Sequence, residues 1–368
     1  MSSHEKLIPD HIKDLVPYPP GKPIEELKRE LGIDNVIKLA SNENPLGPSP
    51  KAVEAIKKAL TNLNRYPDGS CYYLKDRLSE KFGVSAENII IGNGSNELIE
   101  FLVRVLIRPG LNIIMSEPSF LIYKKAVQAV GGETIVAPHK KKHDLKAIKE
   151  AVNESTRLIF LDNPHNPTGS ILSKEEFEAF LNDLPRHLFV VLDEAYIEFA
   201  SPSSSIVQGL SFIGKDFRVV TLRTFSKAYG LAGLRIGYGI MDEKLSTYLE
   251  RVRQPFNVNT LAQAGALAAI DDEKHMSKTL ELTRKGKYYL TEKLTSMGLK
   301  VFPSETNFIM VDMGREVRDI YEALLRKGVI VRPMNSYGFP EYIRITIGLP
   351  EENERCMSAL SDVLSGIF

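Results

Sequence analysis

The 368-residue chain has only two cysteines, no net charge and no long apolar run. Cys71 and Cys356 show neither a CxxC pattern nor metal-site spacing, which predicts reduced thiols in a cytoplasmic protein. Lys plus Arg and Asp plus Glu both total 47, so no overall field attracts nucleic acid or an anionic membrane. Because the chain lacks a run of about 18 apolar residues and a secretory signal pattern, we expect no membrane span and a cytoplasmic location.

Apolar residues make up 43% of the chain, which is enough for a large buried core. Short runs rich in Ile, Val and Leu alternate with amphipathic segments, a pattern typical of a mainly parallel sheet covered on both faces. We therefore predict an α/β fold with a seven-stranded sheet whose ligands bind at the carboxyl ends of the strands. The runs span residues 87–92, 112–118, 134–138, 157–164, 188–196, 218–222 and 235–241.

The chain is long enough for two domains, and its pattern changes after about residue 255. We expect residues 45–270 to form a large domain that contains the ligand-binding edge of the sheet. Residues 271–368, which begin with a long helical stretch, are expected to form a smaller α+β domain. Residues 1–44 predict an N-terminal arm that also supplies part of the smaller domain.

The stretch GNGSNE (92–97) follows an apolar run and opens a predicted helix. Backbone N–H groups at such a helix start, behind small residues, form an anion site for a phosphate. The stretch nearly matches the dinucleotide fingerprint GxGxxG, and Glu117 stands where a ribose-binding acid would, but Glu97 replaces the third glycine. By itself this loop leaves NAD and another phosphate ligand open.

The run HKKKH (139–143) places two histidines at i and i+4, which is one possible spacing for a metal pair on a helix. The run follows Pro138 and is full of lysines. We therefore expect a solvated charge run and no metal site.

Polar side chains follow two further predicted strands. Asn166 stands in the turn DNPHNPTG (162–169) and offers an amide donor at the sheet edge. Asp193 ends the apolar part of LFVVLDEAY, and a carboxylate there is costly unless a cation or a metal pairs with it. Because no histidine or second acid stands at metal spacing, a cationic ligand atom is the better partner. Tyr196 adds a phenol three residues on.

The stretch TLRTFSKAYGLAGLRIGYG (221–239) adds Ser226, Lys227 and Arg235 at another strand end. A lone lysine at such a place is usually solvated, but Lys227 has partners along the same edge of the sheet. Pyridoxal phosphate needs this set, because its phosphate binds helix N–H groups, a hydroxyl and an arginine. Its pyridine nitrogen needs a carboxylate, and its aldehyde needs a lysine for a Schiff base. NAD has no use for Lys227 and Asp193 in these places.

These motifs resemble those of the fold-type I aminotransferases, and more closely those of the histidinol-phosphate aminotransferase family. The resemblance covers nearly the whole chain, through LVPYPPGKPIEEL, KLASNENPLGPSP, NRYPDG, NPHNPTG, DEAYIEF, RTFSKAYGLAGLRIGY and YIRITIG. NPTG and SKxxxxxGLR occur in many such aminotransferases. ASNENPLGPSP with RYPD is narrower, although phosphothreonine decarboxylases carry a variant of it. The resemblance implies a pyridoxal 5′-phosphate enzyme with a large and a small domain.

Family roles carry over to this chain residue by residue. Lys227 resembles the Schiff-base lysine that also moves the proton, and Asp193 resembles the partner of the pyridine nitrogen. Asn166 and Tyr196 resemble donors to the phenolic oxygen of the cofactor. Phe120 stands where relatives stack a tyrosine on the ring, so stacking is kept without the hydroxyl. The implied phosphate cradle is formed by Ser95, Asn96, Ser226 and Arg235.

The resemblance also implies partners and a substrate. Tyr66 of NRYPDG resembles a tyrosine that reaches the cofactor phosphate of the neighbouring subunit, which implies a homodimer with shared active sites. Arg344 of YIRITIG resembles the arginine that grips the substrate carboxylate or phosphate, and Arg332 and Tyr18 are further candidates for the phosphate. The implied reaction transfers the amino group of L-histidinol phosphate to 2-oxoglutarate, giving imidazole-acetol phosphate and glutamate in histidine biosynthesis.

Other interpretations stay open at this point. An aromatic amino-acid aminotransferase or a phosphothreonine decarboxylase would share the fold and cofactor, because the reactions differ in substrate or in the Cα bond that breaks. An NAD-dependent oxidoreductase built on GNGSNE would bind nicotinamide instead. A non-catalytic regulator would keep the cofactor and show no turnover.

Overall fold

The computed structural model describes residues 4–17, 21–138, 141–216 and 218–366. Its larger sheet has seven strands, of which β8 alone runs against its neighbours. The prediction of a mainly parallel α/β sheet is therefore confirmed. In spatial order the strands are β2 (Ile89–Gly92), β8 (Gly237–Ile240), β7 (Val219–Thr224), β6 (Phe189–Asp193), β5 (Thr156–Asp162), β3 (Asn112–Glu117) and β4 (Glu133–Pro138).

Helices cover both faces of this sheet because its strands are apolar on both sides. In β5, Leu158 and Phe160 pack into one core cluster, while Ile159 and Leu161 pack into another on the opposite face. The first face carries α5 (Ser95–Leu106), α6 (Ile122–Ala129) and α9 (Glu243–Val252). The other face carries α4 (Tyr72–Phe82), α7 (Leu145–Glu150), α8 (Lys174–Asn182) and α10 (Thr260–Ile270), and α3 (Pro50–Ala59) packs against α10.

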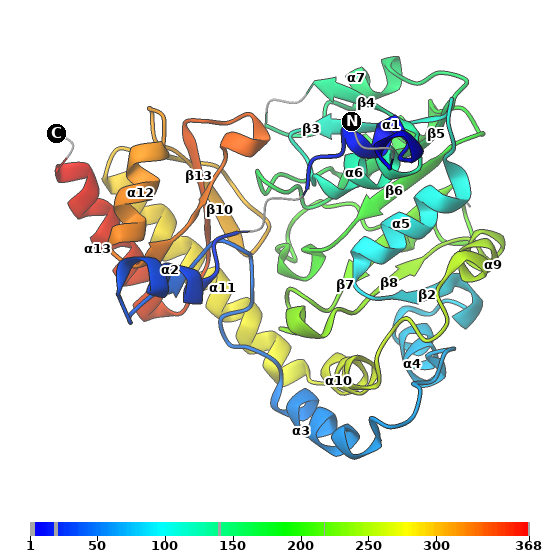
Figure 1. Cartoon of the computed structure of the whole chain (residues 1–368), viewed down its shortest axis with the longest axis horizontal. Coiled ribbons are helices and arrows are strands. Elements are labelled where there is room, and N and C mark those ends of the chain that lie inside the picture. The colour runs from blue at the N-terminus through cyan, green and yellow to red at the C-terminus, as the bar shows by residue number, and fades with distance from the viewer. Residues whose placement is uncertain (1–3, 18–20, 139–140, 217, 367–368) are drawn as a thin grey trace.

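A second, smaller sheet lies beside the first (Figure 1). Its antiparallel order is β12 (Arg332–Pro333), β13 (Tyr342–Thr346), β10 (Phe308–Asp312) and β9 (Lys300–Val301). The short strand β1 (Ile37–Lys38) pairs in parallel with β11 (Val329–Ile330), so the N-terminal segment joins this part of the fold. The helices of this part are α2 (Ile24–Leu31), α11 (Glu273–Ser296), α12 (Arg318–Arg326) and α13 (Pro350–Ser365).

The 24-residue helix α11 connects the two parts of the molecule (Figure 1). Near its start, Thr279 accepts a hydrogen bond from Asn44, whose amide also donates to the carbonyl of Ala228. Near its end, Leu290 and Leu294 are buried in the core of the smaller sheet. One continuous helix thus fixes the smaller sheet relative to the loop that carries Lys227.

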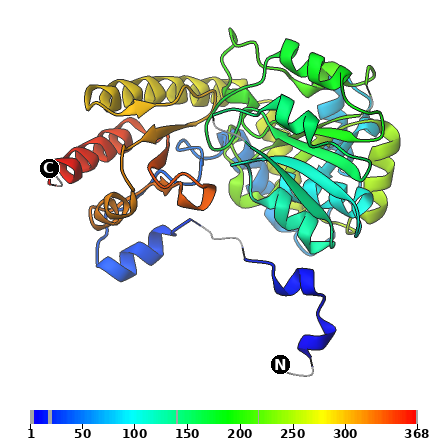
Figure 2. The ribbon, with the colours of Figure 1, turned by 90° about the horizontal axis from the view of Figure 1, so that it is seen from above.

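The N-terminal segment lies along the outside of the molecule, as Figure 2 shows. Its helix α1 (Asp10–Lys13) contacts α6, where Gln128 donates to the carbonyl of His11 over 3.1 Å. Among the described residues, no helix is both long and apolar enough to cross a membrane.

Candidate active site

The carboxyl ends of β5, β6 and β7 and the N-terminus of α5 meet at a cavity of about 170 Å³. The meeting follows from topology, because neighbouring parallel strands end at the same edge of their sheet. The structure brings nine residues nominated from the sequence to this cavity: Ser95, Asn96, Phe120, Asn166, Asp193, Tyr196, Ser226, Lys227 and Arg235.

Lys227 lies in the loop after β7, with its ammonium group beside the backbone of the N-terminal segment. Its Nζ donates to the carbonyl of Ser41 at 3.2 Å and lies 5.7 Å from the ring centre of Tyr196. Burial, helped by the positive charge of Arg344, lowers the pKa of Lys227 to about 8. A large share of this lysine is therefore a neutral amine near pH 8, which is the form that attacks a carbonyl carbon.

Asp193 ends β6 and is 5% exposed. Burial raises the pKa of Asp193 to about 7, even though the hydroxyl of Tyr123 donates to its Oδ2 at 2.8 Å. No cation of the described chain forms an ion pair with it. A protonated ligand nitrogen beside Asp193 would supply the missing positive charge and would itself be held protonated.

The stretch GNGSNE, for which the sequence predicts an anion site, ends β2 and begins α5. Gly94 precedes the helix with φ of 83°, a backbone conformation that residues other than glycine rarely adopt. Ser95 and Asn96 form the first turn of the helix. Arg235 faces this turn, since a Cβ added to Gly94 would lie 2.6 Å from its Nη2. Arg235 also donates to the hydroxyl of Ser226 over 3.3 Å. Helix N–H groups, a hydroxyl and a guanidinium thus converge on one point.

Arg344 on β13 extends from the smaller sheet to Asn166, a residue that lines the cavity. Its Nη1 donates to Oδ1 of Asn166 at 2.5 Å, and its Nη2 donates to the carbonyl of Ala40 at 3.0 Å. Arg344 is 5% exposed, and its guanidinium carbon lies 5.0 Å from the ring centre of Phe308. Its Nε has no hydrogen-bond partner among the described residues. A buried cation with an unused donor is costly, so an anion beside Arg344 would be stabilised.

Of the other nominated residues, Arg344 contacts the lining residue Asn166, whereas Arg332 and Tyr66 lie apart from the cavity. Arg332 pairs with Arg344 in the register of β12 and β13, but it borders a different hollow with Gly21 and Tyr321. Tyr66 is 82% exposed and stacks on Phe256 at 4.7 Å. Tyr18 lies outside the described residues.

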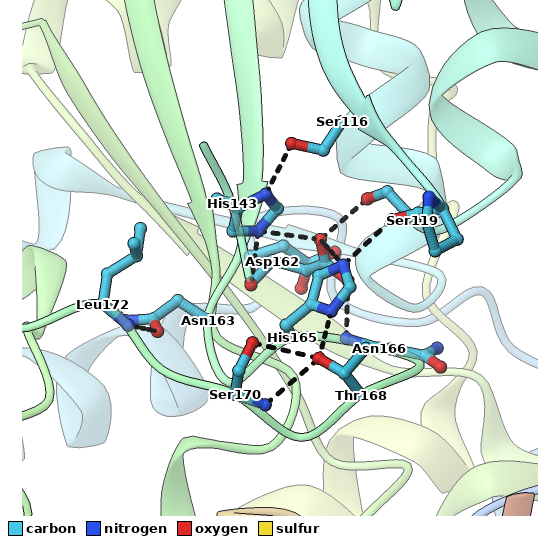
Figure 3. A network of polar contacts seen from close by, with 12 residues as sticks. Ser116, Ser119, His143, Asp162, Asn163, His165, Asn166, Thr168, Ser170 and Leu172 are labelled. Atoms are coloured by element: carbon cyan, nitrogen blue, oxygen red, sulfur yellow. Dashed lines mark hydrogen bonds and ion pairs between the residues drawn. The ribbon is translucent and has the colours of Figure 1, made fainter. Parts of the chain in front are cut away.

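The expectation of a solvated charge run at residues 139–143 was wrong for its last residue. Lys141 and Lys142 are not buried, but His143 is only 3% exposed. It packs against Asp162 and His165, and their donor atoms lie within 4.8 Å of one another (Figure 3). The periodicity of a lysine-rich loop gave no sign of this, because the partners of His143 come from another strand end.

The cavity also contains residues that the sequence did not nominate, among them Tyr123, Asp162 and Thr224. The rule that a carboxylate ending a buried strand needs a partner identified Asp193, and applied to RLIFLD it also identifies Asp162. Tyr123 carries no such signal, because an aromatic residue on an amphipathic helix is usually part of the core.

The dinucleotide interpretation of GNGSNE does not hold. β2 is an edge strand whose neighbour β8 is antiparallel, whereas the fingerprint belongs to a parallel βαβ unit. Glu97, in place of the third glycine, accepts from the backbone N–H of Asn93 at 2.6 Å and from Asn257 at 2.6 Å.

The fold and this cavity define a class I or II aminotransferase. Residues 34–360 match the family model described as aminotransferase class I and II. The chain is 50% identical over 360 residues to the histidinol-phosphate aminotransferase of Desulfotalea psychrophila, which covers 97% of this chain and 95% of that protein. It is 46% identical over 368 residues to histidinol-phosphate aminotransferase 2 of Pseudomonas aeruginosa, covering 99% of this chain and 100% of that protein.

A solved structure gives the same result. The crystal structure of histidinol-phosphate aminotransferase from Sinorhizobium meliloti in complex with pyridoxal-5′-phosphate matches with a TM-score of 0.91 and 30% identity, covering 98% of both chains. The chain belongs to the histidinol-phosphate aminotransferase family, as its motifs predicted. It is thus a transferase, and the fold-type I architecture is confirmed.

Proposed function

We propose that this protein uses pyridoxal 5′-phosphate to transfer the amino group of L-histidinol phosphate to 2-oxoglutarate, giving imidazole-acetol phosphate and glutamate. The observation that carries the proposal is the placement of Lys227, a lysine of lowered pKa, in one cavity with Asp193 and the α5 anion site. The names of the relatives in Desulfotalea and Pseudomonas support the substrate and the place in histidine biosynthesis.

The donor set of the cavity fits the cofactor. The start of α5, with Ser95 and Asn96, would hold the phosphate together with Ser226 and Arg235. Asp193 would pair with the pyridine nitrogen, and Phe120 would lie against the ring. When bound, the cofactor supplies an electron sink for the pair of electrons left at Cα.

The chain supplies the proton transfers and the positioning. Asp193 would hold the proton on the ring nitrogen, because its own burial makes a neighbouring cation favourable. Tyr196 and Asn166 would donate hydrogen bonds to the phenolic oxygen. Lys227, whose pKa of about 8 lies near working pH, would take and return the proton at Cα.

A transaminase must accept two amino compounds in turn, here one with a phosphate and one with a second carboxylate. Arginine pairs bidentately with either anion. We assign the shared contact to Arg344, because it is buried beside Asn166 and keeps an unused Nε donor. Arg332 and Tyr18 remain candidates for the substrate phosphate.

The assembly, domain division and location complete the proposal. A homodimer is supported by Tyr66, an exposed aromatic residue that has no role in its own cavity and would contact the cofactor phosphate of the neighbouring subunit. We divide the chain into residues 45–270 and 271–368, with residues 1–44 joining the smaller domain through β1. A cytoplasmic location is supported by Cys71 and Cys356, which are unpaired and buried.

The test compares kcat/KM for histidinol phosphate, histidinol and phenylalanine in the parent and in Arg344→Ala, with Arg332→Ala beside it. Removal of the substrate phosphate should reduce kcat/KM of the parent at least tenfold and affect Arg344→Ala much less, because a charge-assisted hydrogen bond is worth about 1.5–3 kcal/mol. Equal use of phenylalanine by the parent would indicate an aromatic aminotransferase. Release of CO₂ from phosphothreonine without keto-acid formation would indicate a decarboxylase.

A further inference from the structure

We propose that Asp162 is a positioning residue that fixes Phe120 and Asn166 relative to each other at the cavity, with His143 and His165 as braces. The inference rests on the proposed function, because the cavity concerned is the one assigned to pyridoxal phosphate. Asp162 ends β5, is 3% exposed and lies at the centre of the polar network in Figure 3.

The Asp162 carboxylate acts as an acceptor for several donors. Its Oδ1 accepts from the hydroxyl of Ser119 at 2.7 Å, and its Oδ2 accepts from the backbone N–H of Asn166 at 2.7 Å. Oδ1 also lies 3.4 Å from Nε2 of His143 and 3.9 Å from Nε2 of His165. Burial opposes ionisation, but the imidazoles and the Ser119 hydroxyl outweigh it and hold the pKa of Asp162 below its usual range.

This network joins the loops that follow three strands. Ser119 and Pro118 follow β3, His143 follows β4, and Asp162 and His165 end and follow β5. Nε2 of His165 donates to the carbonyl of Pro118, and Nε2 of His143 donates to the carbonyl of Asp162, each at 3.0 Å. The loops are therefore tied to one another through side chains rather than through the sheet ladder.

The two loops that Asp162 joins directly each deliver a wall of the cavity. Ser119 immediately precedes Phe120, whose ring lines the cavity, and the backbone of Asn166 is held through its own N–H. Loss of the carboxylate would free these two walls from each other while leaving the strands paired. The spacing between the ring of Phe120 and the amide of Asn166 is thus set by Asp162 through its contacts with the two loops.

His143, Asp162 and His165 lie close enough together to hold a metal ion, but their hydrogen bonds argue against a metal site. Nε2 of each imidazole donates to a carbonyl oxygen, which can only accept, so Nε2 carries a proton. The Nδ1 atoms of His143 and His165 are bonded to the hydroxyls of Ser116 at 2.8 Å and Thr168 at 2.7 Å. A metal would have to displace several of these bonds at once.

The experiment uses the holoenzyme and the variants Asp162→Asn and Ser119→Ala. An asparagine brings two N–H donors to a place where the Ser119 hydroxyl and the Asn166 N–H already donate. Because a backbone N–H cannot turn, the Oδ1 of the asparagine should stay with Asn166, and its Nδ2 then faces Ser119 and Nε2 of His143. The Ser119 hydroxyl can turn to accept, but the contact is no longer charge-assisted and the protonated Nε2 of His143 meets a second donor, so we expect the two loops to shift relative to each other. Asp216→Asn is the matched control, since Asp216 is a hydrogen-bonded carboxylate that precedes β7 at the opposite edge of the sheet.

Three quantities are measured: the rate of cofactor loss, the visible circular dichroism of the bound cofactor and the melting temperature. Asp162→Asn should lose the cofactor about tenfold faster, which is the effect expected for the loss of one charge-assisted hydrogen bond. It should also change the visible dichroism of the bound cofactor. Ser119→Ala should shift both in the same direction by less, and Ser119→Ala should add little in the Asp162→Asn background. Asp216→Asn should lower the melting temperature alone.

Cofactor loss and dichroism equal to the parent in both variants would overturn the proposal, whatever their melting temperatures. If Asp162→Asn is not recovered folded, Ser119→Ala decides alone by the same two readouts. If metal analysis finds one zinc ion per chain in the parent and none in His165→Asn, the three residues form a metal site and the proposal is overturned. A parent that takes up no pyridoxal phosphate refutes the proposed function itself, whereas a parent that binds it and variants that match the parent refute only this inference.

Discussion

The side-chain amide of Asn42 donates a hydrogen bond to the hydroxyl oxygen of Tyr196 over 2.8 Å. Asn42 has a left-handed φ of 55°, which asparagine tolerates better than most residues. Thr346 on β13 accepts from its backbone N–H and donates to its Oδ1, each at 3.0 Å. Asn42, a residue of the N-terminal segment, therefore connects the smaller sheet to Tyr196 in the cavity. Because the Tyr196 oxygen accepts from the Asn42 amide, its own proton can be donated to a ligand.

We expect Asn42→Asp to reduce transamination as much as Tyr196→Phe does. Aspartate keeps the left-handed conformation and the bond from Thr346, but it offers no amide donor and accepts the Tyr196 proton instead. Both changes remove one donor to the bound cofactor, so kcat should fall about tenfold in each. The double variant should be no slower than either single variant. Independent, multiplying losses in the double variant would contradict the link between these residues.

Much of the fold and the strand-end part of the site could be predicted from the sequence, because both depend on local patterns. Apolar runs specify parallel strands, and polar residues that end such strands, such as Asp193 and Asn166, must gather at one edge. The contacts of Asn42 with Tyr196 and of Tyr123 with Asp193 span 154 and 70 residues of chain. Such pairings depend on how loops close over the sheet, which leaves no periodic trace in the sequence.

Covalent capture of pyridoxal phosphate by the cofactor-free protein should accelerate as pH rises through about 8. Burial lowers the pKa of Lys227 to about 8, and Arg344 and Arg235 add to the effect, partly offset by Glu43. The neutral amine is the reactive form, so the rate should level off above that pH. In Arg344→Ala the midpoint should move upward, because one nearby cation is lost and water gains access.

The rise in absorbance at fixed cofactor concentration, followed by stopped flow between pH 6.5 and 9.5, measures this midpoint. Arg332→Ala is the control, because this change removes an equal charge from the neighbouring strand, where Arg332 borders a separate hollow. Equal midpoints in the parent and Arg344→Ala would show that Arg344 does not act on Lys227.

Asp193→Asn should stabilise the cofactor-free protein while it impairs transamination. Burial raises the folded-state pKa of Asp193 to about 7, so the folded state binds a proton that the unfolded state loses above its ordinary pKa. The resulting stability is present below that ordinary value and is lost as pH rises through about 7. At pH 8 the variant should be more stable on the order of 3 kcal/mol, and the difference should shrink toward pH 4.

Urea unfolding of the cofactor-free proteins at pH 5 and pH 8 tests this sign. Asp216→Asn supplies a control of opposite sign, since the bond from Arg218 lowers the pKa of Asp216. That variant should be less stable than the parent by about the same amount at pH 5 and pH 8, because the contribution of Asp216 is lost only below its ordinary pKa. A free energy of unfolding at pH 8 that is higher in the parent than in Asp193→Asn would show that Asp193 is ionised without cost in the folded protein.

The last prediction compares two glycines that have similar positive φ angles. Gly94 and Gly110 have φ of 83° and 85°, so alanine at either position should cost about 1 kcal/mol of stability or somewhat more. A Cβ at Gly110 meets nothing within 4 Å, whereas a Cβ at Gly94 would lie 2.6 Å from Nη2 of Arg235. Because a guanidinium at the end of a flexible side chain can move aside, the clash should displace Arg235 rather than unfold the chain.

Gly94→Ala should therefore weaken the affinity of the cofactor-free protein for pyridoxal phosphate about tenfold, the effect of one lost charge-assisted contact. Gly110→Ala should leave that affinity unchanged while it lowers the melting temperature. In an Arg235→Ala background, Gly94→Ala should add little, because the displaced group is already absent. An equal loss of affinity in Gly110→Ala would assign the effect to backbone strain and would separate Arg235 from phosphate binding at the start of α5.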